Sequence, residues 1–178
     1  MEKILTNPLA AAQSVSDYTT YVDADGLPIN YGQEVESVRA NAAVAAGDVV
    51  RFVAATTTVP LSVTPIELDA TVVNAQAIYG VAVSAAAAGS LCQVITKGPA
   101  LVNIATTAAI SSNVAGTAAT PAFGVLAVPA GAGSGNAPGN CHGLTPSAST
   151  IVGASFGVFL GAEIGTSNKA PVYVGKSV

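Results

Sequence analysis

The residue pair that could most readily do chemistry is Cys141 and His142, within the segment Asn140–Gly143. A cysteine and a histidine can act as nucleophile and base when the imidazole takes the thiol proton. Catalytic pairs are normally brought together from distant positions, because the side chains of adjacent residues usually diverge. His142 is also the single histidine of the chain. We therefore interpret the pair as a surface-loop histidine beside an incidental cysteine, and we predict no catalytic residues and no enzymatic activity.

Other spacings that could hold an anion or a metal ion are incomplete. The run Gly131–Gly135 resembles a phosphate loop, but it lacks the Lys-Ser/Thr ending and a strand-loop-helix context. Two cysteines and one histidine offer three soft metal ligands, and Cys92 is far in sequence from the other two. Asp23 and Asp25 resemble the start of a calcium loop, yet Gly26 follows directly and no downstream Glu stands at the closing position. We predict neither a metal site nor a cofactor.

The sequence around these candidate residues predicts β-strands. The stretch Ile78–Ile104 holds three short apolar runs, separated by a small-residue bend ending at Gly89-Ser90 and by Lys97-Gly98-Pro99. Each run has the length of a strand, and each break holds a residue that permits a positive φ or cannot continue a hydrogen-bonded ladder. The stretch therefore predicts a three-stranded meander, with bulky Tyr79, Val81 and Val83 on one face and small residues on the other.

Further strand patterns surround the meander, and helix signals are weak because the alanine runs are short. The segment 129–150 has the composition of a long Gly/Pro/Ser-rich loop. An aromatic-Gly-Val pattern at Tyr79 recurs at Phe156, which predicts two related hairpins. The expected fold is all-β, a small β-barrel or sandwich with an extended N-terminal arm. The other predicted strands are Val49–Ala54, short pieces within Thr56–Val73, Phe123–Val128, Phe156–Leu160 and Pro171–Val174.

Residues 1–40 differ from the rest, and we predict that they form the arm while residues 41–178 form the body. They hold six of the ten acidic residues, two of the six basic residues and three of the five tyrosines. A segment with tyrosines and few aliphatic residues can lay aromatic rings on a partner while folding poorly alone. An alternative is a terminus that is merely flexible or locally packed. The candidate contacts to a partner or another subunit are Leu5, Tyr18, Tyr21 and Tyr31.

Composition limits the classes of function. Charged residues make up 9% of the chain, against about 25% in ordinary soluble proteins. With so few charges, much of the surface is expected to be covered by other subunits. The net charge of −4 and the pI near 4.6 argue against nucleic-acid binding. No apolar run is long and uninterrupted enough for a membrane helix or an export signal, so we expect an intracellular protein with two free thiols.

Several short motifs along residues 41–178 resemble the capsid-cement (head decoration) proteins of tailed bacteriophages. The resemblance implies a compact β-rich body that binds the outside of an icosahedral shell as a dimer or trimer and stabilises it, without catalysis. It implies the major capsid protein as partner and the capsid exterior of the virion as location. The loop 129–150 and the acidic arm depart from the short family pattern. The motifs are, in order, Ala46-Gly47-Asp48-Val49-Val50, Tyr79-Gly80-Val81-Ala82-Val83, Ala86-Ala87-Ala88-Gly89 leading into Gln93-Val94-Ile95-Thr96-Lys97-Gly98, and Phe156-Gly157-Val158 with Val172-Tyr173-Val174.

Two other functions stay open at this point. Small β-barrels with long arms also serve as tail-tube or head-fibre subunits, which form rings or open-ended assemblies rather than small closed oligomers. A host- or carbohydrate-binding surface module would need exposed aromatic platforms. The absence of tryptophan and an aromatic content of 5% count against that module.

Overall fold

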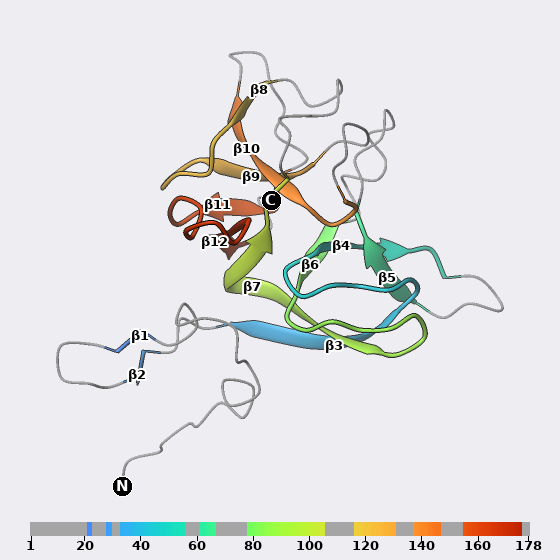
Figure 1. Cartoon of the computed structure of the whole chain (residues 1–178). Helices are drawn as coiled ribbons and strands as arrows, with labels where there is room; N and C mark the ends of the chain where they lie inside the picture. The colour runs from blue at the N-terminus through green and yellow to red at the C-terminus, as the bar shows by residue number, and fades with distance from the viewer. Residues whose placement is uncertain are drawn as a thin grey trace, which may run out of the picture.

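A computed structural model describes residues 21–22, 28–29, 33–55, 61–66, 78–105, 116–130, 137–146 and 155–175 of the chain (Figure 1). All regular secondary structure in these residues is β-strand, which confirms the all-β prediction. Accordingly, the described residues contain no helix that could cross a membrane. The strands are β1 (Tyr21–Val22), β2 (Pro28–Ile29), β3 (Glu34–Ala40), β4 (Val49–Val53), β5 (Ser62–Pro65), β6 (Ile78–Ala82), β7 (Leu91–Asn103), β8 (Gly116–Ala119), β9 (Leu126–Pro129), β10 (Cys141–Pro146), β11 (Gly157–Phe159) and β12 (Lys169–Val174).

Five of these strands close into a barrel. They are hydrogen-bonded in the order β3-β5-β4-β6-β7, and β3 pairs again with β7 to complete the ring. Inward side chains of all five strands fill the interior, which we call the barrel core. The barrel form of the predicted fold is thereby confirmed. The barrel core contains Ala40, Val44, Val50, Val63, Ala82, Ala86, Cys92 and Val94, with Val38, Phe52 and Tyr79 packed against it.

The sheet continues beyond the barrel from the second half of β7. The further order is β12-β11-β9-β10-β8, all antiparallel. This extension curls back on itself, because Ile104 after β7 forms a bridge with Cys141 of β10. A second core fills the space between the extension and the outer wall of the barrel.

The barrel wall is therefore buried on both faces where β4, β6 and β7 run. Successive residues of a strand face opposite sides, so Val50 enters the barrel core while Val49 enters the second core. Both are fully buried. Because both faces are buried, the sequences of these strands are nearly continuous apolar runs and do not alternate between apolar and polar residues.

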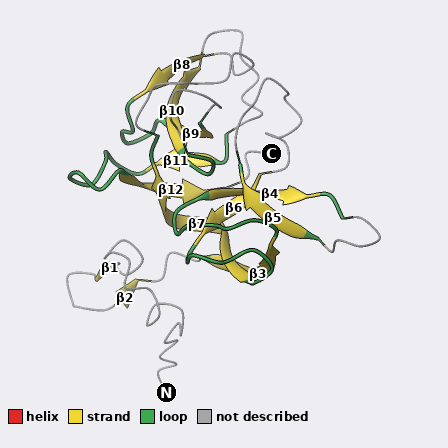
Figure 2. Ribbon diagram, turned by 45° about the vertical axis from the view of Figure 1, so that its right-hand side comes forward, coloured by secondary structure: helices red, strands yellow, loops and turns green. Residues whose placement is uncertain are grey.

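β7 joins the two halves of the molecule, as Figure 2 shows. Its first part pairs with β3 and β6, and residues 98–103 pair with β12. Our prediction placed a strand break at Lys97-Gly98-Pro99, but the chain bends there without ending. Gly98 supplies the bend through its φ of 102°. The predicted meander is thus two strands, of which the second is long and changes partners at the bend.

Three further expectations need correction. The barrel begins at Glu34 rather than at Asn41, since β3 completes the ring and so cannot belong to a free arm. β10 lies within the segment predicted as a loop, where its flanking glycines and prolines hid the short strand. Tyr79 does not share a face with Val81, because the register with β4 shifts between Val50 and Arg51.

The predicted echo between the two aromatic-Gly-Val motifs has a structural counterpart. A Cβ on Gly80 would collide with the carbonyl oxygen of Ile95 on the neighbouring strand β7. A Cβ on Gly157 would collide in the same way with the carbonyl oxygen of Tyr173 on β12. Both glycines allow a neighbouring backbone to approach closely, one in the barrel and one in the extension.

Candidate functional site

The predicted contact residues of the arm fall largely outside the described residues. Tyr21 begins β1 and pairs with Ile29 of β2 in a small two-stranded sheet. Leu5, Tyr18 and Tyr31 lie outside the described residues, as do Asp23, Asp25 and the run 131–135. Their contacts with a shell or another subunit stay predictions.

Cys141 and His142 do not lie in a surface loop, and that prediction is wrong. Both belong to β10, where His142 stands opposite Val128 of β9 and is 6% exposed. As neighbours in a strand, their side chains point to opposite faces of the sheet. The sheet therefore separates the thiol from the imidazole, which does not suit a nucleophile and its base.

The two thiols lie in different cores. Cys92 is in the barrel core and Cys141 in the second core, and both are free. Burial raises the pKa of the Cys141 thiol well above its usual range. Burial, and then the charge of Asp48, raise the pKa of Cys92. Both thiols stay protonated near neutral pH and are weak nucleophiles. Within the described ranges, no three His, Cys, Asp or Glu side chains gather as metal ligands would.

An open groove of about 390 Å³ lies where the start of β3 meets the bend of β7 and the end of β12. We call it the acidic groove, because two carboxylates and one ammonium group line it. The groove draws its residues from the barrel and from the extension. They are Glu34, Glu36, Tyr79, Thr96, Lys97, Tyr173 and Gly175.

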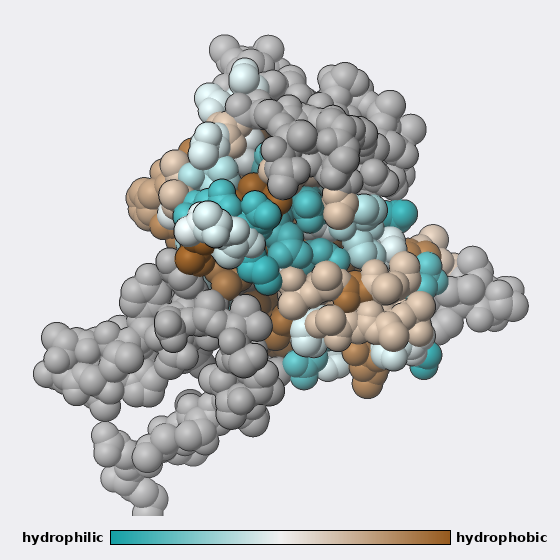
Figure 3. Space-filling model, viewed as in Figure 1, coloured by the Kyte–Doolittle hydropathy of each residue, from teal (hydrophilic) through white to brown (hydrophobic). Residues whose placement is uncertain are grey.

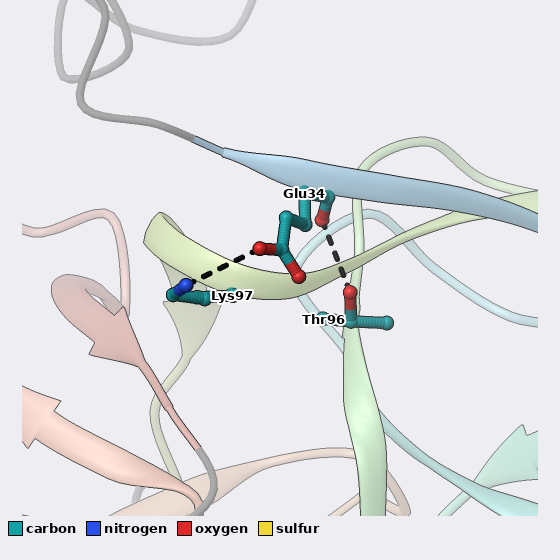
Figure 4. A network of polar contacts seen from close by, with 3 residues as sticks. All are labelled: Glu34, Thr96 and Lys97. Carbon is teal, nitrogen blue, oxygen red and sulfur yellow. Dashed lines mark hydrogen bonds and ion pairs between the residues drawn. The ribbon is translucent and has the colours of Figure 1, made fainter.

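Two polar contacts connect residues that line the acidic groove (Figure 4). Lys97 Nζ lies 3.2 Å from Glu34 Oε1, and Thr96 Oγ1 donates to the backbone oxygen of Glu34 at 3.3 Å. The Lys97 and Glu34 side chains are 56% and 62% exposed, so this ion pair adds little stability. Because the Lys97 ammonium group offsets the charge of one carboxylate, the two carboxylates and the ammonium group together give the groove a net charge of one carboxylate.

The remaining carboxylate of the groove is held by a tyrosine. The hydroxyl of Tyr79 donates to Glu36 Oε2, and the Tyr79 ring packs on Phe52 with centroids 4.2 Å apart. Burial first, and then the hydrogen bond to and charge of Glu36, raise the pKa of Tyr79 to about 12. The groove thus presents acceptor oxygens beside tyrosine rings. This chemistry suits a basic or hydrogen-bond-donating side chain of a partner.

A second hollow of about 650 Å³ has four alanines in its lining and includes Asp48 and Arg51. Asp48 is already engaged: the backbone NH of Ala45 donates to its Oδ2 at 2.7 Å, and Asn103 Nδ2 donates to its Oδ1 at 2.9 Å. Burial raises its pKa, although these hydrogen bonds and Lys169 lower it in part. We interpret Asp48 as the joint between the barrel and the extension rather than as a ligand site.

The outer face of the extension carries a row of exposed apolar side chains next to the acidic groove. Val158 of β11 stands directly opposite Tyr173 of β12 on one side and Leu126 of β9 on the other. Leu160 follows β11, and Phe123 precedes β9 in a turn whose Gly124 NH donates to Phe159 O. We call this set the apolar strip. It consists of the half-buried Leu126 and the exposed Phe123, Val158, Leu160 and Tyr173, of which Phe123 is 82% exposed.

A second exposed apolar site lies at the far end of β3. Leu91 is 72% and Leu61 54% exposed, and Arg39 stands opposite both Leu91 and Ser62 in the sheet. Arg39 Nη1 donates to Gly89 O at 2.7 Å, which ties the alanine-rich loop after β6 to this site. We call Arg39, Leu61 and Leu91 the knob. Figure 3 shows weakly hydrophobic surface over the loops that join β3 to β4 and β6 to β7.

Sequence reasoning found none of these three surfaces. Tyr173, Val158 and Leu91 were assigned to strands, but which face of a strand is covered depends on the neighbouring layers. The low charge content of the chain was the one available signal, since it predicted apolar surface without locating it.

Comparisons with known proteins give limited information. No protein-family model and no curated protein matches the sequence. Among solved structures, the chain is similar to the N base of the head fibre protein gp8.5 of bacteriophage phi29. The sequence identity is 16% and the TM-score 0.45, over 80% of this chain and 94% of the phage protein chain. Similarity of this degree does not establish a common fold.

Proposed function

We propose that the chain is an accessory structural protein of a tailed-phage virion, which binds the outer surface of the icosahedral capsid and stabilises it. Its partners are the major capsid protein and further copies of itself, as a dimer or trimer. Its chemistry is recognition: it uses no cofactor, catalyses no reaction, and binds neither nucleic acid nor membrane. It is made in the host cytoplasm and ends on the capsid exterior.

The observation that supports this proposal best is the position of the cement-like motifs. The Gly47-Asp48 step is a turn before β4, the Gly80-Val81 motif is β6, and the alanine-rich bend leads from β6 into β7. The first three motifs are thus consecutive parts of one closed barrel, whereas the fourth forms β11 and β12 of the extension. Low charge and exposed apolar surfaces suit a protein that is covered in an assembly.

The test is co-sedimentation of the purified chain with empty capsids of its own virus. We expect saturable binding by the full chain and loss of binding when residues 1–32 are deleted, since the arm is proposed to cross onto neighbouring shell subunits. The deletion stops before β3, so that the barrel keeps all its strands. Full-chain protein that stays in the supernatant would contradict the capsid-binding function. Binding that survives the deletion would contradict the role of the arm alone.

A head-fibre or tail-tube subunit is the second candidate. The observation that favours it is the presence of two separate exposed apolar surfaces, the knob and the apolar strip, which suit contacts that repeat from subunit to subunit. Electron microscopy of the chain without capsids separates the two functions. Tubes or fibres formed alone would favour the second candidate, and small closed oligomers the first.

A further inference from the structure

The large hydrophobic side chains exposed on the described residues sort into two groups. Leu61 and Leu91 belong to the knob, and Phe123, Val158, Leu160 and Tyr173 belong to the apolar strip. Pro99, which stands opposite Tyr173, lies eight positions after Leu91 along β7. At about 3.3 Å per residue the two groups are about 26 Å apart along the strand. They are therefore two surfaces and not one patch.

The two surfaces carry opposite charge. The knob holds the guanidinium of Arg39, which donates a hydrogen bond to Gly89 O and forms no ion pair with any residue that the structure describes. The apolar strip ends at Tyr173, which also lines the acidic groove with its two carboxylates and one ammonium group. One surface thus combines leucines with a cation, and the other combines an apolar row with a net anion. Complementary charge beside complementary apolar area is how interfaces select and orient a partner.

We propose that the chain binds a second copy of itself head to tail, with the knob of one copy seated on the apolar strip and acidic groove of the next. In this arrangement Leu91 meets the row around Val158, and Arg39 faces Glu36. The proposal rests on the self-association included in the proposed function, and it assigns the surfaces that make it.

A two-fold contact of strip with strip fits less well. Packing strip against strip would bring the acidic grooves of both copies toward the same interface, and like charges held close together oppose association. It would also leave the knobs exposed. A head-to-tail contact covers both surfaces in every copy of a closed ring, and it leaves one of each exposed at the ends of an open chain. A three-membered ring is the closed form that matches the proposed trimer.

The test uses two variants of the full-length chain, each of which damages one surface. Leu91→Asp places a charge in the knob, and Val158→Asp places one in the apolar strip. Both positions are exposed, so both variants are expected to keep the circular dichroism and thermal melt of the wild type. Thr117→Asp, at an exposed position of β8, is the matched control and should associate like the wild type.

Light scattering after size exclusion, with sedimentation velocity over a range of concentrations, gives the oligomeric state. We expect the wild type to form oligomers and each variant alone to be monomeric. Mixed in equal amounts, the two variants should form a one-to-one heterodimer. One intact contact is available, between the knob of Val158→Asp and the strip of Leu91→Asp, and the heterodimer cannot grow further.

Charge exchange tests the orientation within the contact. Arg39→Glu and Glu36→Lys should each raise the dissociation constant about tenfold. The double variant carries both substitutions, so it restores a pair of opposite charges across the contact with the signs exchanged. Its dissociation constant should return to within about threefold of the wild type. Thermal melts of all three variants control for the loss of the Tyr79 hydrogen bond to Glu36.

Several results would overturn the inference. They are a monomeric wild type at all concentrations, oligomers that persist in Leu91→Asp, a mixture of variants that stays monomeric, and a double charge variant weaker than either single one. Failure here is distinguishable from failure of the proposed function. A monomer that still co-sediments with capsids overturns only the head-to-tail contact, and a head-to-tail oligomer that ignores capsids overturns only the capsid binding.

Discussion

Tyr79 and Glu36 link the barrel to the acidic groove. The Tyr79 ring packs against Phe52 at the barrel core, while its hydroxyl reaches a carboxylate that lines the groove. Because Tyr79 lies at a register shift in β6, it stands apart from Ile78 and Val81, which pack in the second core. Tyr79, at the register shift, therefore contacts both the barrel core, through its ring, and a carboxylate of the acidic groove, through its hydroxyl.

The ionisation of Tyr79 leads to a prediction at alkaline pH. Its pKa is raised from 10 to about 12 in the folded state. A raised pKa contributes stability that is complete below pH 10 and is lost as the pH rises through 12. In a spectroscopic titration of the phenolate absorbance, we expect one tyrosine to ionise only as the pH approaches 12. Tyr79→Phe should remove that late step and reduce the alkaline loss of stability. An unchanged titration curve in the variant would contradict the assignment.

Gly80 is the residue whose small size the barrel most directly requires. We expect Gly80→Ala to lower the free energy of unfolding by about 1–3 kcal/mol, because the new methyl group would overlap the Ile95 carbonyl. Gly161→Ala is the matched control, since a Cβ there meets only Pro171 Cγ at 3.5 Å, an ordinary contact. Denaturant unfolding of both variants measures the difference. Equal stability of the two variants would show that β6 and β7 can move apart without cost.

At the scale of elements, the turn before β4 is tied to the end of β7. Asn103 Nδ2 donates to Asp48 Oδ1 and to Ala46 O, and the backbone NH of Asn103 donates to Gly47 O at 3.0 Å. These contacts hold the barrel to the extension independently of the second core. This joint includes the Asp48 carboxylate, whose pKa is raised because burial disfavours its charged form.

Asn103→Ala tests this joint. The variant removes the Asn103 donor from one oxygen of the buried Asp48 and from the Ala46 carbonyl, which keeps Lys169 Nζ at 3.4 Å. We therefore expect a loss of about 1–3 kcal/mol in unfolding free energy at neutral pH. The hydrogen bond from Asn103 lowers the pKa of Asp48 and so favours its charged form. The loss should therefore shrink as the pH falls and Asp48 becomes protonated. Unfolding curves at neutral and acid pH provide the measurement, and a loss that grows toward acid pH would contradict the role of Asn103.

A strand of this protein is predicted well from the sequence when its signals are local, and poorly when its bounds depend on pairing with strands that are distant in the sequence. β6, β11 and β12 were expected close to their observed bounds, because their alternation and flanking glycines are local signals. β7 was divided at Gly98-Pro99, since a local rule could not foresee that β12 would take over the pairing from β3. β3 was assigned to the arm because its charged and polar residues face outward, and only Val38, Ala40 and Val35 pack inward against the cores.

For the whole molecule, the boundary between arm and body decides which truncations fold. We expect deletion of residues 1–32 to leave a cooperatively folded protein. Deletion of residues 1–40 should instead open the barrel, since β3 pairs with both β5 and β7. Thermal melts and hydrogen exchange of the two proteins measure this difference. Cooperative unfolding of the longer deletion at an unchanged temperature would mean that β5 and β7 can close the barrel without β3.

The fold class followed from composition and strand patterns, whereas the site did not. Apolar runs and turn residues are enough to predict a β-rich body. The acidic groove brings together Glu36, Tyr79 and Tyr173, which are distant in sequence and meet only after the barrel closes and β12 docks on β7. The spacing of these residues in the sequence does not indicate that they lie close together in the folded protein.

β3 and β12 pair with adjacent parts of β7, and this arrangement has a practical consequence for peptide display. Glu34, where the chain enters the barrel, is opposite Lys97, and Val174, where it leaves the extension, is opposite Gly98. The two ends of the folded body are thus anchored at neighbouring residues of one strand. A cargo fused after Gly175 would therefore start close to the point where the chain enters the barrel, whereas a cargo inserted in the exposed turn at Phe123 would start from a different strand connection.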